Sequence, residues 1–224
     1  MTRAVIFDMY ETLITHYQSP LYFGAQMAKD AGISEAQFQV LWHSTESDRT
    51  IGKLTLQEVL EMILRENQCY SEELLKNIVE KRMEAKKACF QHLHPEILPM
   101  LAQLKEKDIL IGLISNCFSE EAEVIRESEL FPYFDAVFLS YEQGVQKPEE
   151  EIFYRCMKKL SVKAEECLYV GDGGSFELET ARKVGMRAAQ AVWYLKEGTK
   201  QPSGRKEDFL QLETPLEVLN YLKF

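Results

Sequence analysis

The sequence predicts an α/β protein built on a parallel sheet, and three observations support this fold class. Five short apolar runs lack the alternation of a half-exposed strand, amphipathic stretches separate them, and four of the runs end in polar or small residues. Unbroken apolar runs of this length are typical of strands that are buried on both faces of a parallel sheet. Because such strands alternate with helices, we expect a Rossmann-like core.

Each element follows from its own local pattern. The strands are predicted at residues 4–7, 109–114, 136–139, 168–170 and 188–193, and the helices at 95–107, 120–130, 148–160 and 176–184. The helix at 148–160 has the clearest signals, because Pro148 opens it, glutamates occupy its first turn and lysines its last. A capping box at 214–217 predicts a final helix that reaches Leu222, after a polar loop at 198–208.

One long segment interrupts the alternation of strands and helices. From residue 19 to residue 90 the pattern is helical, with capping signatures at 34–37 and 55–58 and no convincing strand. An insertion directly after the first strand lies near the carboxyl ends of the strands, where open α/β sheets bind ligands. We therefore predict a core domain of residues 1–14 and 91–224 and an inserted all-helical cap domain of residues 15–90.

Composition limits the partners and the location of the chain. Among its 224 residues, Asp and Glu number 36 against 26 Lys and Arg, and this net charge of -10 disfavours nucleic acid as a partner. No apolar segment approaches the ~20 residues of a membrane span, and the short run before Asp8 is no signal peptide. The five cysteines lack C-x-x-C spacing, which favours the reducing cytoplasm over a disulfide framework or a zinc site. The oligomeric state stays open.

Polar residues follow the predicted strands, or precede a predicted helix, in a distinctive order. In chain order they are Asp8, Ser115, Asn116, Lys147, Asp172 and Glu177. Each signal taken alone is typical of a turn former, a strand-end hydroxyl or a solvated charge. Because the carboxyl ends of parallel strands meet at one edge of a sheet, their joint order predicts a single site.

This ordered set resembles the four motifs of the haloacid dehalogenase-like (HAD) hydrolase superfamily, and the resemblance extends from Asp8 to Glu177. It implies that Asp8 is a nucleophile that forms a covalent aspartyl intermediate. Lys147 would offset the charge that Asp8 and an anionic phosphate bring together, and Ser115 would donate its hydroxyl to a phosphoryl oxygen. These three residues are therefore the expected catalytic group.

The resemblance also implies a magnesium site. Asp8, Asp172 and the backbone carbonyl of Tyr10 would hold Mg²⁺, with Glu177 supporting Asp172 and acting through a water. Carboxylates that surround a carboxylate nucleophile repel one another unless a cation is present. The acidic residues after the fourth strand therefore favour Mg²⁺ as the cofactor.

Tyr10 departs from the phosphatase pattern of the superfamily, which has a second aspartate two residues after the nucleophile. A tyrosine with a reference pKa of ~10 cannot replace a carboxylic acid that works near neutral pH. The general acid is therefore missing, or Glu11 or His16 supplies the proton. A tyrosine at this position also resembles the 2-haloacid dehalogenase branch, in which a halide leaves without a proton.

These observations together predict a Mg²⁺-dependent phosphatase that acts on a small phosphomonoester through an aspartyl-phosphate at Asp8. Two alternatives stay open: a hydrolase of the 2-haloacid dehalogenase type, and a catalytically weak protein that only binds a phosphorylated ligand. Tyr10 and Asn116 are expected to contact the substrate. Arg49 is a third candidate, because the polar stretch at 44–50 before Gly52 could direct its guanidinium toward an anionic group.

Overall fold

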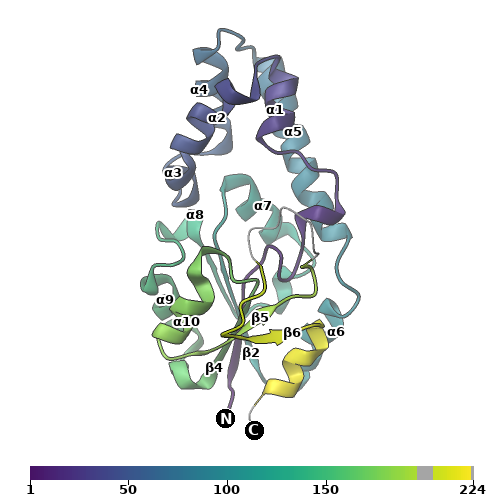
Figure 1. Ribbon diagram of the computed structural model, residues 1–224, viewed down its shortest axis with the longest axis vertical. Helices are drawn as coiled ribbons and strands as arrows, with labels where there is room; N and C mark the ends of the chain where they lie inside the picture. Colours follow the sequence, from purple (N-terminus) through teal and green to yellow (C-terminus); the bar gives the residue numbers. More distant parts are fainter. Residues whose placement is uncertain (196–203, 223–224) are drawn as a thin grey trace.

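A single parallel sheet of six strands forms the centre of the protein (Figure 1). The computed structural model describes residues 1–195 and 204–222. The strands lie in the order β3-β2-β1-β4-β5-β6, and their bounds are β1 Ala4–Phe7, β2 Leu110–Ser115, β3 Ala136–Leu139, β4 Cys167–Gly171, β5 Arg187–Ala191 and β6 Leu210–Leu212. The five predicted strands are confirmed. The sixth was not predicted, because it is only three residues long and only one of the three is buried.

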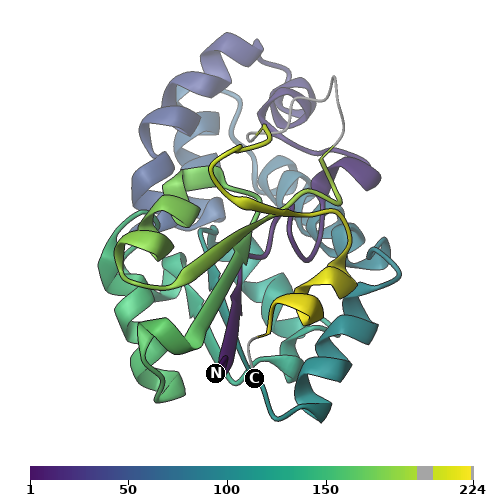
Figure 2. The same cartoon turned by 60° about the horizontal axis from the view of Figure 1, so that its bottom comes forward.

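Helices cover both faces of the sheet (Figures 1 and 2). Val5 and Phe7 of β1 pack against α6 and α7, whereas Ala4 and Ile6 pack against α9 and α10. The bounds of these helices are α6 Ile97–Glu106, α7 Ser119–Glu127, α9 Glu150–Leu160 and α10 Glu177–Lys183, with a short α8 at Ser140–Gln143. Because β1 is central and covered on both faces, all four of its side chains are apolar and buried.

Short 3₁₀ helices connect these elements, and one of them corrects a prediction. They are η1 His16–Gln18, η2 Cys89–Gln91, η3 Phe131–Tyr133, η4 Ala164–Glu166, η5 Gly174–Phe176 and η6 Pro215–Tyr221. The predicted final helix is η6, and its predicted capping box is wrong, because the Thr214 side chain accepts no capping hydrogen bond. Glu217 instead accepts a hydrogen bond from the backbone N–H of Glu213.

The helix bounds differ from the predictions by a few residues, for example at the end of α7, which is Glu127 rather than residue 130. α9 begins at Glu150 rather than at Pro148, because Glu149 has an extended backbone. Of the predicted loop at 198–208, residues 198–203 lie outside the described residues. Among the residues that the structure describes, no helix is long and apolar enough to cross a membrane.

Five α-helices lie between β1 and α6, beyond the carboxyl ends of the strands (Figure 1), and all of them except the short α3 supply side chains to a core of their own. Their bounds are α1 Gly24–Ala31, α2 Glu35–Ser44, α3 Glu46–Thr50, α4 Leu56–Glu66 and α5 Glu72–Ala88. Capping boxes begin α2 at Ser34 and α4 at Thr55, as predicted. Residues 15–90, all of them described, contain no strand. The insertion is therefore all-helical, while the exact domain boundaries stay a prediction.

Candidate active site

A buried ion pair lies at the carboxyl ends of β1 and β4. Asp8 directly follows β1, and its backbone N–H donates a hydrogen bond to the carbonyl of Val170 in β4. The Lys147 ammonium lies 2.6 Å from the Asp8 carboxylate and also contacts the carboxylate of Glu177. Both Asp8 and Lys147 are more than nine-tenths buried. A cation therefore faces the predicted nucleophile in a site with little access to solvent.

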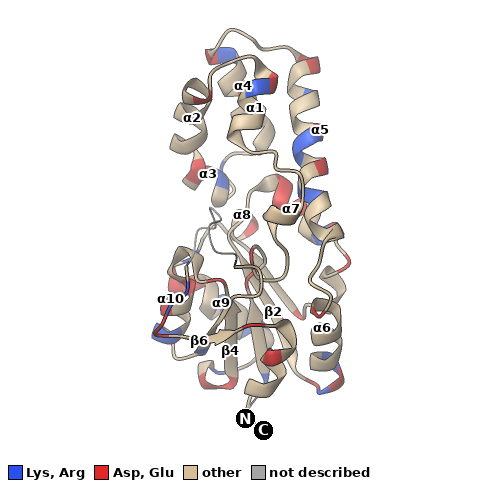
Figure 3. Cartoon of the chain, turned by 45° about the vertical axis from the view of Figure 1, so that its right-hand side comes forward, with Lys and Arg blue, Asp and Glu red and all other residues tan. Residues whose placement is uncertain are grey.

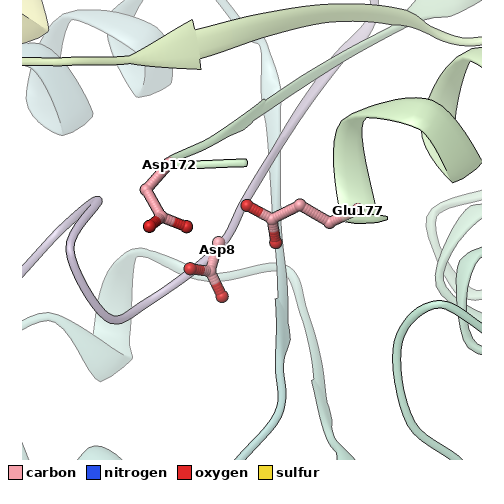
Figure 4. A group of neighbouring side chains, drawn as sticks. All are labelled: Asp8, Asp172 and Glu177. Atoms are coloured by element: carbon pink, nitrogen blue, oxygen red, sulfur yellow. The ribbon is translucent and has the colours of Figure 1, made fainter. Parts of the chain in front are cut away.

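Three carboxylates converge at this point (Figure 4). One oxygen from each of Asp8, Asp172 and Glu177 lies within 4.8 Å of the others. Burial, together with the charges of Glu177 and Asp172, raises the pKa of Asp8 to about 8, although Lys147 opposes the shift. The direction of this shift reflects burial first and the neighbouring carboxylates second.

Lys147 remains protonated in this environment. Burial alone would lower its pKa, but the charges of Asp8 and Glu177 outweigh burial and raise the pKa above the usual value. The Asn116 side chain fixes the backbone of Lys147 from both sides: its carbonyl accepts from the Lys147 N–H at 2.8 Å, and its amide donates to the Lys147 carbonyl at 2.9 Å. Asn116 therefore positions the lysine.

The donor set fits a hard divalent cation. Asp8 and Asp172 supply carboxylate oxygens from neighbouring strands, and all three carboxylates meet with one lysine as the nearby cation. The oxygens of Glu177 are already engaged, since they accept hydrogen bonds from the Gly173 N–H at 3.1 Å and the Tyr169 hydroxyl at 2.8 Å. All-oxygen ligands of this kind are those that Mg²⁺ prefers. Asp8 and Asp172 are the better direct ligands, with Glu177 behind them.

Ser115 is buried below the site, whereas Tyr10 borders the cavity over Asp8. Ser115 ends β2 fully buried, where its hydroxyl donates to the carbonyl of Asn116 at 3.4 Å. Tyr10 borders the cavity over Asp8, but its hydroxyl is buried and has no hydrogen-bond partner among the described residues. Burial raises the pKa of Tyr10 well above its ordinary value. The phenol is therefore a poor proton donor at neutral pH.

The two candidate acids form a pair beside Tyr10. The His16 ring stacks on the Tyr10 ring, with centroids 4.4 Å apart, and its Nδ1 lies 3.4 Å from Glu11. Glu11 accepts hydrogen bonds from the Thr15 hydroxyl at 2.6 Å and the His16 N–H at 3.0 Å. Burial would raise the pKa of Glu11, but these hydrogen bonds lower it, so the carboxylate stays ionised near neutral pH. Burial and the charge of Lys86 lower the pKa of His16, so neither residue is held in the protonated form that a general acid needs.

Arg49 packs between two aromatic rings. Its guanidinium carbon lies 3.7 Å from the ring centre of Trp42 and 4.1 Å from that of Phe118, and one of its nitrogens donates to the Trp42 carbonyl at 2.7 Å. The residue is 1% exposed and does not border either cavity described below. Its expected contact with an anionic substrate stays a prediction.

Two connected cavities open between the sheet and the inserted helices. The carboxylate cavity, of about 210 Å³, is bordered by Asp8, Asp172 and Glu177. The wide cavity, of about 740 Å³, extends from Lys147 and Asn116 to the insertion. Tyr10, His16, Asn116, Lys147 and Ser175 border both.

A buried charge network joins the insertion to the core near these cavities, and Figure 3 shows basic positions on α5 next to acidic positions on α7. Lys86 of α5 lies 2.5 Å from Glu121 of α7 and 2.7 Å from the His16 ring, while Arg82 lies 3.1 Å from Glu120. Burial opposes ionisation of Glu121, but Lys86 and Arg82 outweigh it and lower the pKa to about 2. These ion pairs fix α5 against α7.

Sequence reasoning did not identify Tyr169 or this charge network. Tyr169 lies within the apolar run of β4, where a buried ring is the ordinary interpretation, and no sequence signal marks its hydroxyl as a partner of Glu177. Lys86 and Glu121 look like surface charges on two separate amphipathic helices. Only the packing of α5 on α7 brings them together.

Comparisons with known proteins agree with this geometry. Residues 2–185 match the family model of the haloacid dehalogenase-like hydrolases. The chain is 27% identical over 135 residues to a glyceraldehyde 3-phosphate phosphatase of Methanopyrus kandleri, which covers 58% of this chain and 56% of the relative. It is 30% identical over 106 residues to the N-acylneuraminate-9-phosphatase of Rattus norvegicus, which covers 47% of this chain and 42% of the relative. The chain thus spans about half the length of these curated relatives.

Solved structures extend the likeness over almost the whole chain. A HAD phosphatase from Thermococcus onnurineus superposes with a TM-score of 0.67 at 20% identity and covers 99% of this chain and 98% of its own. A 2-haloacid dehalogenase from Pseudomonas syringae superposes with a TM-score of 0.68 at 20% identity and covers 98% of this chain and 97% of its own. At this identity they establish the fold alone. Together with the family match, the fold and the ordered motifs show that the chain belongs to the haloacid dehalogenase-like hydrolases.

Proposed function

We propose that the protein is a phosphatase that hydrolyses a small phosphomonoester with Asp8 as the nucleophile. The observation that carries the proposal is the buried carboxylate of Asp8, 2.6 Å from the Lys147 ammonium and facing two further carboxylates. An anionic phosphate needs such a cation before a carboxylate can approach it. The phosphatases among the relatives support the same reaction.

In the proposed reaction an Asp8 oxygen attacks phosphorus, and the bond to the leaving oxygen breaks, which gives an aspartyl-phosphate. Water then attacks the phosphorus and releases inorganic phosphate and the free carboxylate. Lys147 offsets the charge of Asp8 and the phosphoryl group, and Asn116 holds Lys147 in place. Ser115 would have to turn its hydroxyl from the Asn116 carbonyl to bind a phosphoryl oxygen.

We propose Mg²⁺ as the cofactor, held by Asp8, Asp172 and the Tyr10 carbonyl, with Glu177 behind them. Bound Mg²⁺ would supply positive charge that lets the phosphoryl group approach the carboxylates. The inserted helices would act as a cap, because the wide cavity is bordered both by the core and by the insertion. The cytoplasmic location stays a prediction.

Tyr10 favours a second candidate reaction. A halide leaves carbon without taking a proton, so hydrolytic dehalogenation of a 2-haloacid would not need the aspartate that Tyr10 replaces. The carboxylate cluster argues against it. Dehalogenation by attack on carbon needs no metal ion, and without a cation the clustered carboxylates repel one another. Halide release from 2-haloacids distinguishes the two reactions.

Phosphate release tests the proposal directly. Wild-type protein and Asp8→Asn are assayed against a panel of phosphomonoesters in Mg²⁺ and in EDTA, with Asp48→Asn on α3 as a matched control. We expect Asp8→Asn to lose at least roughly a thousandfold in kcat, because the amide cannot attack phosphorus. Full activity of the control confirms that the assay reports the site. An Asp8→Asn protein that keeps a few per cent of the wild-type rate would exclude Asp8 as the nucleophile.

A further inference from the structure

The charged residues around the wide cavity determine which leaving groups it can accept. This inference rests on the proposed phosphatase function. Lys147 is the one Lys or Arg that borders this cavity among the residues that the structure describes, and its charge is committed to Asp8 and Glu177. The insertion contributes Glu46, Ser47, Thr50 and His43 instead. The wall that the insertion contributes beyond the phosphate site is therefore polar and contains no Lys or Arg among the described residues.

Three other cationic side chains near the wide cavity contact protein groups rather than the cavity. Lys86 and Arg82 pair with the buried glutamates of α7. Arg49 is stacked between Trp42 and Phe118, donates one hydrogen bond to the Trp42 carbonyl and borders neither cavity, although its Nε and Nη1 have no hydrogen-bond partner among the described residues. Each of these three cations is more than nine-tenths buried. Bringing one of them to a second anionic group of a substrate would break a buried pair or a ring stack, which is costly. A substrate with a second negative charge would therefore find no ready partner.

Glu46 is an acidic residue at the wall of the wide cavity. It is exposed on α3, borders the wide cavity and forms no ion pair within 4.0 Å among the described residues. The pKa of the neighbouring Arg49 is lowered to about 10 by burial, although the charges of Glu120 and Glu46 act against that shift. Glu46 is thus the acidic residue of this cavity wall that has no ion-pair partner among the described residues, whereas Glu121, which also borders the cavity, is paired with Lys86 and Arg82.

We propose that Glu46 is a specificity-determining residue that selects phosphomonoesters whose leaving group is uncharged or cationic and rich in hydroxyl or amino groups. The Ser47 and Thr50 hydroxyls and the His43 ring can exchange hydrogen bonds with such a group. A leaving group that carries a carboxylate would be repelled by Glu46 and meet no cation. The cavity volume of about 740 Å³ accommodates a leaving group of several carbon atoms.

A matched pair of substrates tests this selection. Glycerol 3-phosphate and 3-phosphoglycerate share a three-carbon skeleton and differ by a hydroxymethyl group against a carboxylate. The ratio of their kcat/KM values is measured in Mg²⁺ for wild type and for each variant. We expect the wild-type ratio to favour glycerol 3-phosphate by at least about tenfold, the factor that ~1.4 kcal/mol produces.

Substitutions at two acidic positions of α3 separate a specific effect from a general change in charge. Glu46→Lys should lower the ratio by about tenfold or more, because the wall then attracts a carboxylate. Asp48→Lys makes the same charge change on a residue that does not border the cavity, and it should leave the ratio unchanged. Added potassium chloride should reduce the wild-type ratio, because salt screens an exposed charge.

Three results would overturn the inference. A wild-type preference for 3-phosphoglycerate contradicts it, and so do equal changes in the ratio from Glu46→Lys and Asp48→Lys. A ratio that salt does not alter contradicts its electrostatic basis. Failure of the proposed function looks different, because the wild-type protein would then release no phosphate even from an aryl phosphate, and both proposals would fall together.

Discussion

Removal of the Lys86 ammonium should destabilise the protein strongly, because Lys86 lies at the centre of the charge network between α5 and α7. Lys86 and Glu121 are 3% and 7% exposed, and their charged atoms lie 2.5 Å apart. In Lys86→Met, the one cation left within 4.0 Å of Glu121 among the described residues is Arg82, at 3.6 Å, and the Phe118 N–H still donates to its carboxylate at 3.0 Å. Breaking one side of a buried pair costs about 3–5 kcal/mol, because the other charge stays buried. We expect a loss of that size in the free energy of unfolding.

Urea titration at pH 7, followed by circular dichroism and tryptophan fluorescence, measures this loss. Lys87→Met is the matched control: it lies next to Lys86 on α5, but its ion pair with Glu127 is exposed, so we expect little change. The double variant Lys86→Met/Glu121→Leu should recover much of the stability, because both charges are then absent.

The free energy of unfolding that Lys86→Met loses should be smaller at acidic pH than at neutral pH. The pKa of Glu121 is about 2 in the folded protein against an ordinary value of 4.5, so its contribution to stability is present above pH ~4.5 and is lost as the pH falls toward 2. The difference between wild type and Lys86→Met should therefore be largest near neutral pH and narrow below pH ~4.5. A loss under about 1 kcal/mol at pH 7, or an equal loss at pH 3, would refute the reasoning.

Three further substitutions test the site itself. Gly171→Ala places a Cβ 2.1 Å from an oxygen of Glu177, so Glu177 must move; we expect a lower kcat and a loss of roughly 1–3 kcal/mol in stability, and unchanged kcat and urea midpoint would contradict the packing. Asp172→Asn should weaken Mg²⁺ binding in a calorimetric titration, and excess Mg²⁺ should restore part of the rate; undiminished wild-type turnover in EDTA would favour the dehalogenase alternative. Tyr10→Asp should raise the rate on alkyl phosphates more than on aryl phosphates, by up to ~10²-fold, because it restores a general acid; wild-type rates independent of the leaving-group pKa would show that another residue, such as His16, donates the proton.

The sequence predicts the sheet well because its signals are local. Each of the first five strands is a short apolar run, and burial on both faces of a parallel sheet requires that pattern. Asp8 and Asp172 could be placed together for the same reason, since the carboxyl ends of parallel strands meet at one edge of the sheet, and Lys147 was placed with them by its position before a predicted helix in the ordered motifs. Chain order and strand direction were sufficient to predict that they are close.

The remaining features depend on contacts between distant elements. The position of Arg49 is set by Phe118, which follows another strand, and nothing local indicates that a ring from the core will cover that guanidinium. β6 pairs with β5 through three residues, too few for a periodicity to appear. The capping box at Thr214 is an exception, because a competing local hydrogen bond replaces it: Glu217 accepts from the Glu213 backbone N–H instead.

The central place of β1 in the sheet has a consequence for the order in which the chain folds. β1 pairs with β2 at Leu110–Ser115 and with β4 at Cys167–Gly171, so its partners are synthesised long after it. The helices α1–α5 lie between β1 and β2 and have a core of their own. Contacts close in sequence form faster than contacts that close long loops. We expect the helical insertion to gain structure while β1 still lacks partners on both edges, and the sheet that carries Asp8 to assemble only when β4 has been made.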